Sequence, residues 1–269
     1  MRAAAPSRPA PRASVLRTLR IALLLAVLLL VSVTTCEDRM RSVSWRQPLY
    51  VAIYPIAADS SPVTRAYLDA LTAESFADID RFFAREAARY GLSIADPVKT
   101  RLRPEIRDLP PARAPGASLL ATAWWSLTLR YWAWRESGHV RDPEDVRMFV
   151  LYRDPALSPV MPHSLGLAKG LIGVVYAFAA PRMHGGNELV IAHELLHTLG
   201  ATDKYSPIND APRFPDGYGD PRQAPLYPQR TAELMAGRRM LSATRWEQPD
   251  GLDEVVIGPA TALEIRWLK

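Results

Sequence analysis

The feature that most restricts the fold is an apolar segment, residues 189–200, that contains two histidines and a glutamate. Its sequence, Leu-Val-Ile-Ala-His-Glu-Leu-Leu-His-Thr-Leu-Gly, predicts a buried helix that Gly200 ends. Burying His193, Glu194 and His197 in such a helix costs free energy unless their polar atoms find a partner. The fold must therefore supply that partner next to this helix.

The spacing of the two histidines indicates what the partner is. Residues four apart in a helix stand on one face, so the imidazoles of His193 and His197 can converge on one ion. Neutral imidazole is a good ligand for Zn²⁺. Glu194 lies one position on, close enough to contact water at the metal, and this pattern is typical of zinc hydrolases with glutamate as general base. A hydrogen-bonded polar cluster without metal is the alternative.

A third ligand can come from the turn after the helix. A zinc hydrolase needs three protein ligands and one open position. Gly200 permits a sharp turn, after which Asp203 can swing back toward the ion. The full string is then H-E-x-x-H-x-x-G-x-x-D.

With this string the chain resembles the metzincin metallopeptidases, and within them the snapalysin-like variant that uses aspartate as third ligand. The resemblance implies that His193, His197 and Asp203 bind one zinc ion and that Glu194 is the catalytic base. It implies a zincin-like α+β fold and a peptide substrate that lies extended along a sheet edge, for which the segment 158–170 is the expected strand or loop. The resemblance is close over residues 171–203 and schematic elsewhere.

Metzincins also place a methionine in a turn beneath the zinc. Met235 lies at a suitable distance downstream, although Met240 competes with it and Met235 can equally be a core residue. Another zincin class takes its third ligand from a second helix, and Glu233 is the candidate for that role. The spacing of Gly200 and Asp203 favours Asp203.

The remaining patterns predict an α+β domain over residues 49–269. A twisted mixed sheet packed on helices forms an N-terminal lobe, 49–200, and the proline-rich stretch 206–230 indicates a loop-rich C-terminal lobe, 201–269. The expected strands are 49–56, 98–106, 146–152 and 171–178. The expected helices are 64–90, 117–137, 188–199 with Asn187 as its N-cap, and 259–267.

The helix predicted over residues 117–137 is unusually aromatic. It contains Trp124, Trp125, Tyr131, Trp132 and Trp134, and its apolar residues extend most of the way around the helix. Aromatic residues at helical spacing usually belong to a core, so we expect this helix to be buried on two sides. A surface for a membrane or a partner is the alternative.

The N-terminus has the pattern of a targeting segment. Five arginines precede an apolar run, residues 21–31, that has the length of a signal-peptide core. We therefore expect residues 1–36 to be a signal peptide or membrane anchor, with Cys36 as a candidate for lipidation, and residues 37–48 to be a tether. The domain is then exported to the periplasm or cell envelope. With one cysteine it has no internal disulfide.

The net charge of +5 comes from those five arginines, because the rest of the chain has 28 basic and 28 acidic residues. This balance argues against a nucleic-acid partner. We expect a zinc metallopeptidase that hydrolyses peptide bonds of a peptide or protein substrate. The alternatives are a zinc hydrolase that acts on a non-protein amide of the envelope, and a non-catalytic zinc-binding envelope protein. Additional candidates for the cleft are His184 and three tyrosines: Tyr205, Tyr218 and Tyr227.

Overall fold

The computed structural model describes residues 17, 18, 20–22, 25, 41–112, 114, 116–138, 144–158, 162–167 and 170–268. Most of the predicted targeting segment, including Cys36, lies outside the described residues. Within the described ranges, no helix combines the length and the hydropathy that crossing a membrane requires.

A five-stranded mixed sheet forms the centre of the molecule, with strand order β2-β1-β3-β5-β4. Four strands are parallel, and β4 pairs antiparallel to β5 at the edge. The α+β class predicted from the sequence is confirmed. The strands are β1 (Leu49–Ala57), β2 (Val98–Leu102), β3 (Val146–Arg153), β4 (Leu165–Leu167) and β5 (Ile172–Phe178).

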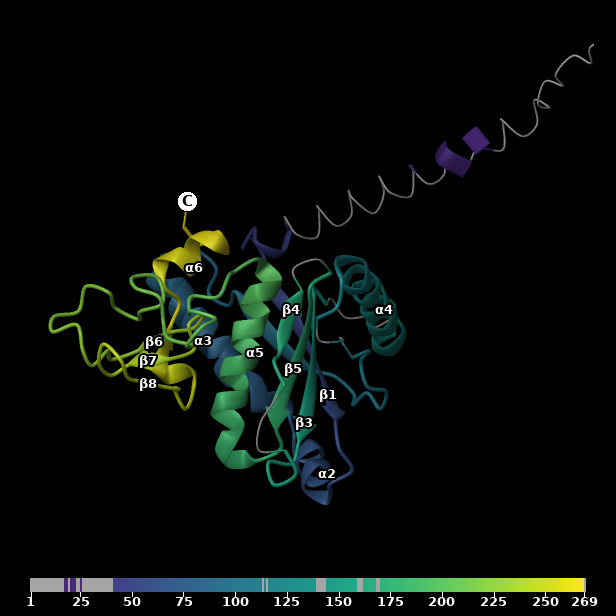
Figure 1. The fold of residues 1–269 in the computed structure, drawn as a ribbon, viewed down its shortest axis with the longest axis horizontal. Helices are drawn as coiled ribbons and strands as arrows, with labels where there is room; N and C mark the ends of the chain where they lie inside the picture. Colours follow the sequence, from purple (N-terminus) through teal and green to yellow (C-terminus); the bar gives the residue numbers. More distant parts are fainter. Residues whose placement is uncertain are drawn as a thin grey trace, which may run out of the picture.

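Helices cover both faces of this sheet (Figure 1). Helices α2 (Pro62–Asp69), α3 (Ala77–Arg89) and α5 (His184–Leu199) share one apolar core with the sheet, while α4 (Leu119–Ser137) packs on the other face. The chain steps from β1 to β2 in one direction and from β2 back past β1 to β3 in the other. Because parallel crossovers are right-handed, this reversal puts α3 and α4 on opposite faces.

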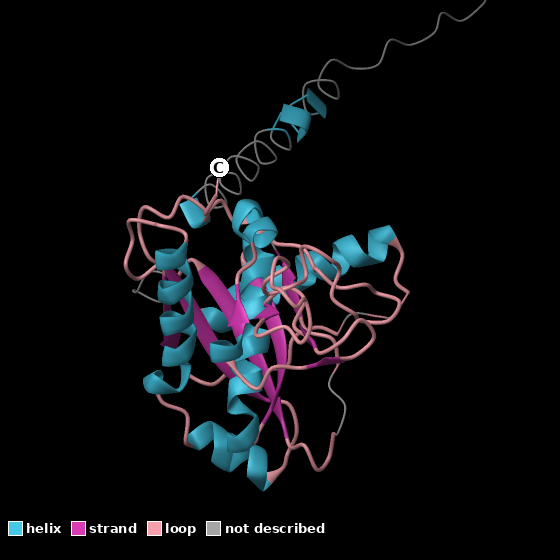
Figure 2. Ribbon diagram, turned by 90° about the vertical axis from the view of Figure 1, so that its left-hand side faces the viewer, coloured by secondary structure: helices cyan, strands magenta, loops and turns pink. Residues whose placement is uncertain are grey.

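After α5 the chain forms a loop-rich C-terminal part that lies beside α5 and α3 (Figures 1 and 2). Its strands have two residues each: β6 (Ala232–Glu233) pairs with β9 (Val255–Val256), and β7 (Arg239–Met240) pairs with β8 (Trp246–Glu247). The last helix is α6 (Pro259–Glu264). Polar contacts fasten this part to α3, since Glu86 accepts from the Ile257 amide and Arg85 donates to the Leu252 carbonyl.

Part of the predicted tether, residues 37–48, belongs to the folded body. Val43 and Trp45 are buried, and the Trp45 indole donates to the Ile265 carbonyl at 2.7 Å. Trp45 also packs edge-on against Trp267. The local composition is polar, so nothing in the sequence indicated that two apolar side chains would be buried in the folded body.

Several predicted boundaries are wrong. The helix expected over 64–90 is divided into α2, a 3₁₀ turn (Ala73–Phe76) and α3, because Thr72 and Ser75 form a capping box that starts a new element. Helix α5 begins at His184, so Asn187 is not its cap. Its side-chain amide bonds instead to both backbone groups of Phe178, which ties α5 to the end of β5.

Candidate metal centre

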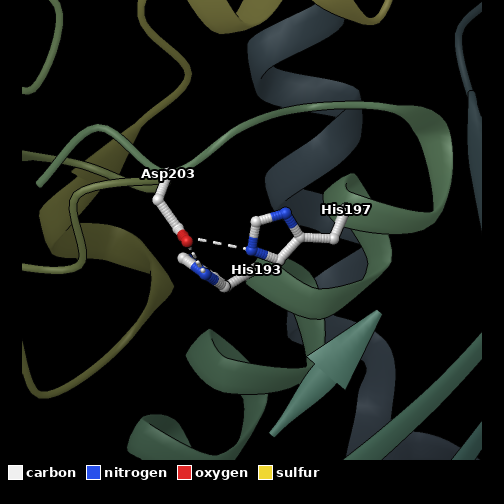
Figure 3. A group of neighbouring side chains, drawn as sticks. All are labelled: His193, His197 and Asp203. Atoms are coloured by element: carbon white, nitrogen blue, oxygen red, sulfur yellow. Dashed lines mark hydrogen bonds and ion pairs between the residues drawn. The ribbon is translucent and has the colours of Figure 1, made fainter. Parts of the chain in front are cut away.

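Helix α5 and the turn that follows it bring three candidate ligands together (Figure 3). Gly200 ends α5 in the left-handed conformation with φ 104°, and the Ala201 amide donates to the Leu196 carbonyl. The reversed chain returns Asp203 to the helix. One carboxylate oxygen, Oδ1, then lies 3.2 Å from Nε2 of His193 and 3.1 Å from Nε2 of His197.

Backbone carbonyls fix the orientation of both imidazoles. Nδ1 of His193 is 3.0 Å from the Leu234 carbonyl oxygen, and Nδ1 of His197 is 2.9 Å from that of Ala201. Since a carbonyl only accepts, each Nδ1 carries a proton and donates it, so the Nε2 atoms are the ones that face Asp203. This is the arrangement that metal-ligating histidines usually have.

The three ligand atoms lie within 4.8 Å of one another, so His193, His197 and Asp203 could hold a metal ion. Burial acts to raise the pKa of Asp203, but hydrogen bonds from the two histidines hold that pKa below its ordinary value. The carboxylate therefore stays ionised. Two imidazoles and one carboxylate form a donor set that suits zinc and leaves a coordination position for a non-protein ligand.

Glu194 lies against the same centre and is almost fully buried. Burial raises the pKa of its carboxyl group, while His193 and His197 act to lower it. Its Oε2 is buried and has no hydrogen-bond partner among the described residues. A buried carboxylate oxygen without a hydrogen-bond partner costs free energy of folding. Such a group is expected where the site has to bind water or substrate.

Strand β4 crosses directly over α5 at this point, and Gly166 makes the crossing possible. A Cβ atom at Gly166 would lie 2.3 Å from the Glu194 carbonyl oxygen and 2.6 Å from Cβ of His197. No other residue fits without moving the backbone. The Gly166 amide also faces Glu194, where it acts to lower the pKa of the carboxyl group. The expected sheet edge around 158–170 thus contains a strand that contacts the metal centre.

An open cleft of about 740 Å³ lies over the cluster, between β4 on one side and the C-terminal part on the other. Its lining residues come from β4 and its approach, from β5, from α5 and the turn before it, and from three C-terminal segments, 203–205, 236–238 and 248–250. They include Ser164, Gly166, Tyr176, Met183, Val190, Glu194, Tyr205, Arg238 and Pro249. An open cleft of this volume can take an extended chain.

Among the three candidate tyrosines, Tyr205 lines the cleft. Burial raises the pKa of its phenol, and the charge of Asp203 raises it further, so the group is a neutral hydrogen-bond donor. The guanidinium of Arg238 lies 5.3 Å from the centroid of its ring. Tyr218 and Tyr227 do not line the cleft, and their hydroxyls bond to each other at 3.0 Å.

Other residues singled out in the sequence have different surroundings. Glu233 does not approach the histidines: it is fully buried, and its carboxylate accepts from Thr261 at 2.6 Å and from the amides of Gly258 and Ala236. His184 bonds to the Tyr67 hydroxyl and the Ser75 carbonyl, and it does not line the cleft.

Met235 is fully buried in a tight turn that Gly237 closes with φ 63°. The residue before it, Leu234, offers its carbonyl to His193, and the Met235 carbonyl accepts from the Lys204 amide, next to Asp203. The turn therefore buttresses two of the three ligands. Met240 lies in β7, where its carbonyl accepts from Gln229. The role of Met235 stays a prediction, and its position in this turn agrees with it.

Two contributions to the site were not predicted. Gly166 stands in a Leu-Gly-Leu strand, and a glycine inside an apolar strand was the available signal for a close backbone approach. The Leu234 carbonyl that orients His193 had no signal, because any residue supplies a carbonyl.

Comparison with known proteins adds little to this geometry. No protein-family model matches the chain, and no curated protein matches it. Among solved structures, OgpA from Akkermansia muciniphila aligns at 14% identity with a TM-score of 0.31. The alignment covers 80% of this chain and 58% of OgpA. A score this low does not establish a shared fold.

Proposed function

We propose that the chain is a zinc-dependent metallopeptidase of metzincin type, with His193, His197 and Asp203 as metal ligands and Glu194 as general base. The observation that carries the proposal is the convergence of three ligand atoms beside a buried carboxylate, at the floor of an open cleft. Within the part of the chain that the structure describes, Oε2 of this carboxylate has no hydrogen-bond partner. A purely structural metal site has no use for that carboxylate.

The chemistry divides between the metal and the chain. A bound zinc ion supplies Lewis acidity, which polarises a scissile carbonyl and acidifies water. Glu194 accepts the proton of the attacking water and donates it to the leaving amine, and its raised pKa suits both steps. The Leu234 and Ala201 carbonyls hold each of the two imidazole rings in the same orientation during both proton transfers.

Tyr205 is the group best situated to stabilise the charge that develops on the substrate carbonyl oxygen. It is a neutral phenol on the cleft wall beside Asp203, and a neutral donor can form a stronger hydrogen bond as negative charge accumulates. The free edge of β4 supplies backbone groups along the cleft, which favours an extended peptide over a compact ligand.

The test is cleavage of an unstructured protein such as casein by the purified full chain. We expect activity that a zinc chelator abolishes and that stoichiometric Zn²⁺ restores. If the zinc-loaded chain cleaves no protein but hydrolyses amides of cell-wall material, the peptidase assignment is wrong and the hydrolase assignment survives. A zinc-loaded chain inactive on both would overturn both assignments.

A further inference from the structure

Helix α4 has two apolar faces, and the sheet covers one of them. On the inner face, Leu129 and Ala133 are fully buried, and Trp132 packs edge-on against Phe149 with ring centroids 4.7 Å apart. The outer face carries large apolar side chains that are more than half exposed: Leu120, Trp124, Leu127, Tyr131 and Trp134. The prediction that this helix is buried on two sides is therefore wrong.

The exposed residues form one continuous stripe, which we call the α4 stripe. Their spacing along the chain alternates between four and three residues, so they follow one line on the helix surface. The exposed fraction is 69% for Trp124 and 62% for Tyr131. Contiguous apolar surface of several hundred Å² is uncommon on a soluble domain and marks an interaction site.

The α4 stripe is separate from the candidate metal centre. The cleft is lined by β4, β5, α5 and C-terminal loops, and no residue of α4 contributes to it. The sheet lies between α4 and α5 (Figure 1). A partner bound to the stripe therefore leaves the cleft open.

Arg41, the first residue of the described range 41–112, lies at the end of the sheet where α4 leads into β3. Arg41 forms an ion pair with Asp145, the residue that precedes β3. Its neighbour Glu144 accepts from the Tyr54 hydroxyl, and Tyr54 stacks on Phe149 beneath α4. Arg41 and its ion-pair partner thus belong to the same corner of the molecule as α4.

The sequence upstream of Arg41 indicates what lies near that corner. The apolar run of residues 21–31, preceded by five arginines, is predicted to engage a membrane. The nine residues from Ser32 to Met40, which separate this run from Arg41, span at most about 32 Å when fully extended. A bilayer that holds the apolar run therefore has to lie within about 32 Å of the corner where α4 ends.

The composition of the α4 stripe suits a bilayer surface. Tryptophan and tyrosine concentrate at membrane interfaces, where their rings are buried and their polar tips stay wet. Here three aromatic residues share the stripe with two leucines, and the residues between them include the small Ala121, Ala123 and Ser126. A second copy of the chain could also cover a stripe with this spacing, but it would not explain why the chain enters at this corner.

We propose that the α4 stripe docks on the lipid bilayer surface, with α4 lying in the plane of the interface. The docked helix holds the body by a second contact besides the predicted N-terminal segment. Because the sheet separates α4 from α5, the cleft then faces away from the lipid, toward substrates that arrive through water.

The experiment uses the full chain reconstituted in phosphatidylcholine vesicles whose acyl chains are brominated, since bromine quenches tryptophan emission only at contact. Trp124 and Trp134 are two of seven tryptophans. We expect bromolipid to quench the parent chain, and Trp124→Phe with Trp134→Phe to reduce that quenching roughly twofold or more, because interfacial rings lie within reach of the upper acyl chain. Trp246→Phe is the matched control: Trp246 is also exposed but lies in β8, and its loss leaves the quenching unchanged.

Three results would overturn the proposal. Bromolipid quenching that is equal in the parent and the double variant means that the stripe does not touch lipid. Full access of aqueous acrylamide to Trp124 in vesicles means that the stripe remains in water. A dimer that Trp124→Glu with Tyr131→Glu converts to a monomer, with an unchanged melting temperature, assigns the stripe to a second copy of the chain.

Discussion

Helices α5 and α4 break the usual rule of burial in opposite ways. Both are apolar in sequence, and both pack on the central sheet. Helix α5 buries ionisable side chains, including Glu194, inside an apolar core. Helix α4 exposes large apolar side chains, including Trp124, on its outer face. Each violation costs free energy in the isolated fold, and each therefore points to a ligand: a metal ion for α5 and a lipid surface for α4.

The largest expected effect comes from Glu194, the carboxyl group that α5 buries beside the metal centre. Glu194→Gln keeps the shape of the side chain and removes the base, so kcat should fall by roughly 10²–10⁴. The zinc content should not change, and the melting temperature should stay the same or rise, because a costly buried carboxylate is gone. Kinetics with an unstructured protein, beside elemental analysis and thermal unfolding, measure all three.

An unchanged kcat in Glu194→Gln would assign the metal centre to a structural role. In that case the variants of the ligands lower stability without any effect on catalysis, and α5 would resemble an ordinary metal-stabilised core helix.

The next effect comes from the cleft wall opposite α5. Tyr205→Phe removes one hydroxyl near Asp203, and we expect kcat to fall about 10- to 100-fold with little change in KM, because the hydrogen bond forms as charge develops. Tyr218→Phe is the control, since its hydroxyl bonds to Tyr227 outside the cleft. A rise in KM at constant kcat in Tyr205→Phe would show that the phenol binds substrate and does not stabilise the transition state.

The close crossing of β4 over α5 gives a smaller effect on stability. A methyl group at Gly166 meets backbone atoms of α5, so Gly166→Ala should cost about 1–3 kcal/mol of unfolding free energy and displace the cluster. Gly186→Ala is the matched control, because a Cβ there meets nothing within 4 Å. It should stabilise α5 by roughly 0.5–1 kcal/mol. Denaturant unfolding of both variants measures these changes in unfolding free energy. Equal unfolding free energies of Gly166→Ala and Gly186→Ala would refute the close contact.

The smallest effect comes from a second buried carboxylate of α5, Glu188, which lies outside the metal centre. Burial raises its pKa to about 7 from the ordinary 4.5, opposed by Arg81. Between these pH values the folded chain keeps a proton that the unfolded chain has lost. Stability therefore falls as pH rises through this window, and it is lowest above pH 7.

Glu188→Gln should consequently raise the melting temperature by a few °C at pH 8 and by much less at pH 5. Thermal unfolding at the two pH values is the measurement. Glu74→Gln, at an exposed carboxyl whose pKa is lowered by hydrogen bonds at its own turn, should show no such gain. An equal gain at both pH values would mean that Glu188 acts through packing and not through its charge.

Much of α5 was predictable from the sequence, whereas the surroundings of both helices were not. The pattern of His193, Glu194, His197 and Asp203 follows from helical spacing and one glycine turn, and the structure brings all four together. Backbone contacts such as the one at Gly166 depend on where distant strands lie, and local spacing carries no such information.

For helix α4, the sequence predicted the position of the element but not the surroundings of its outer face. Its position was predicted within two residues, but its burial was not, because apolar residues on all sides of a helix look the same whether protein or another phase covers them. In the same way, the contact between Trp45 and Ile265 could not be predicted, because the residues around Trp45 in the sequence are polar. Sequence patterns therefore located the elements better than they identified what each face touches.

Zinc content tests the central claim most directly. We expect the full chain, purified without chelator and supplied with zinc, to hold about one ion, and His197→Ala and Asp203→Ala to lose most of it, because each removes one of three ligands. His184→Ala, a histidine of the same helix outside the cluster, should keep the ion. A parent chain without zinc, or an Asp203→Ala variant that retains it fully, would contradict the three-ligand centre.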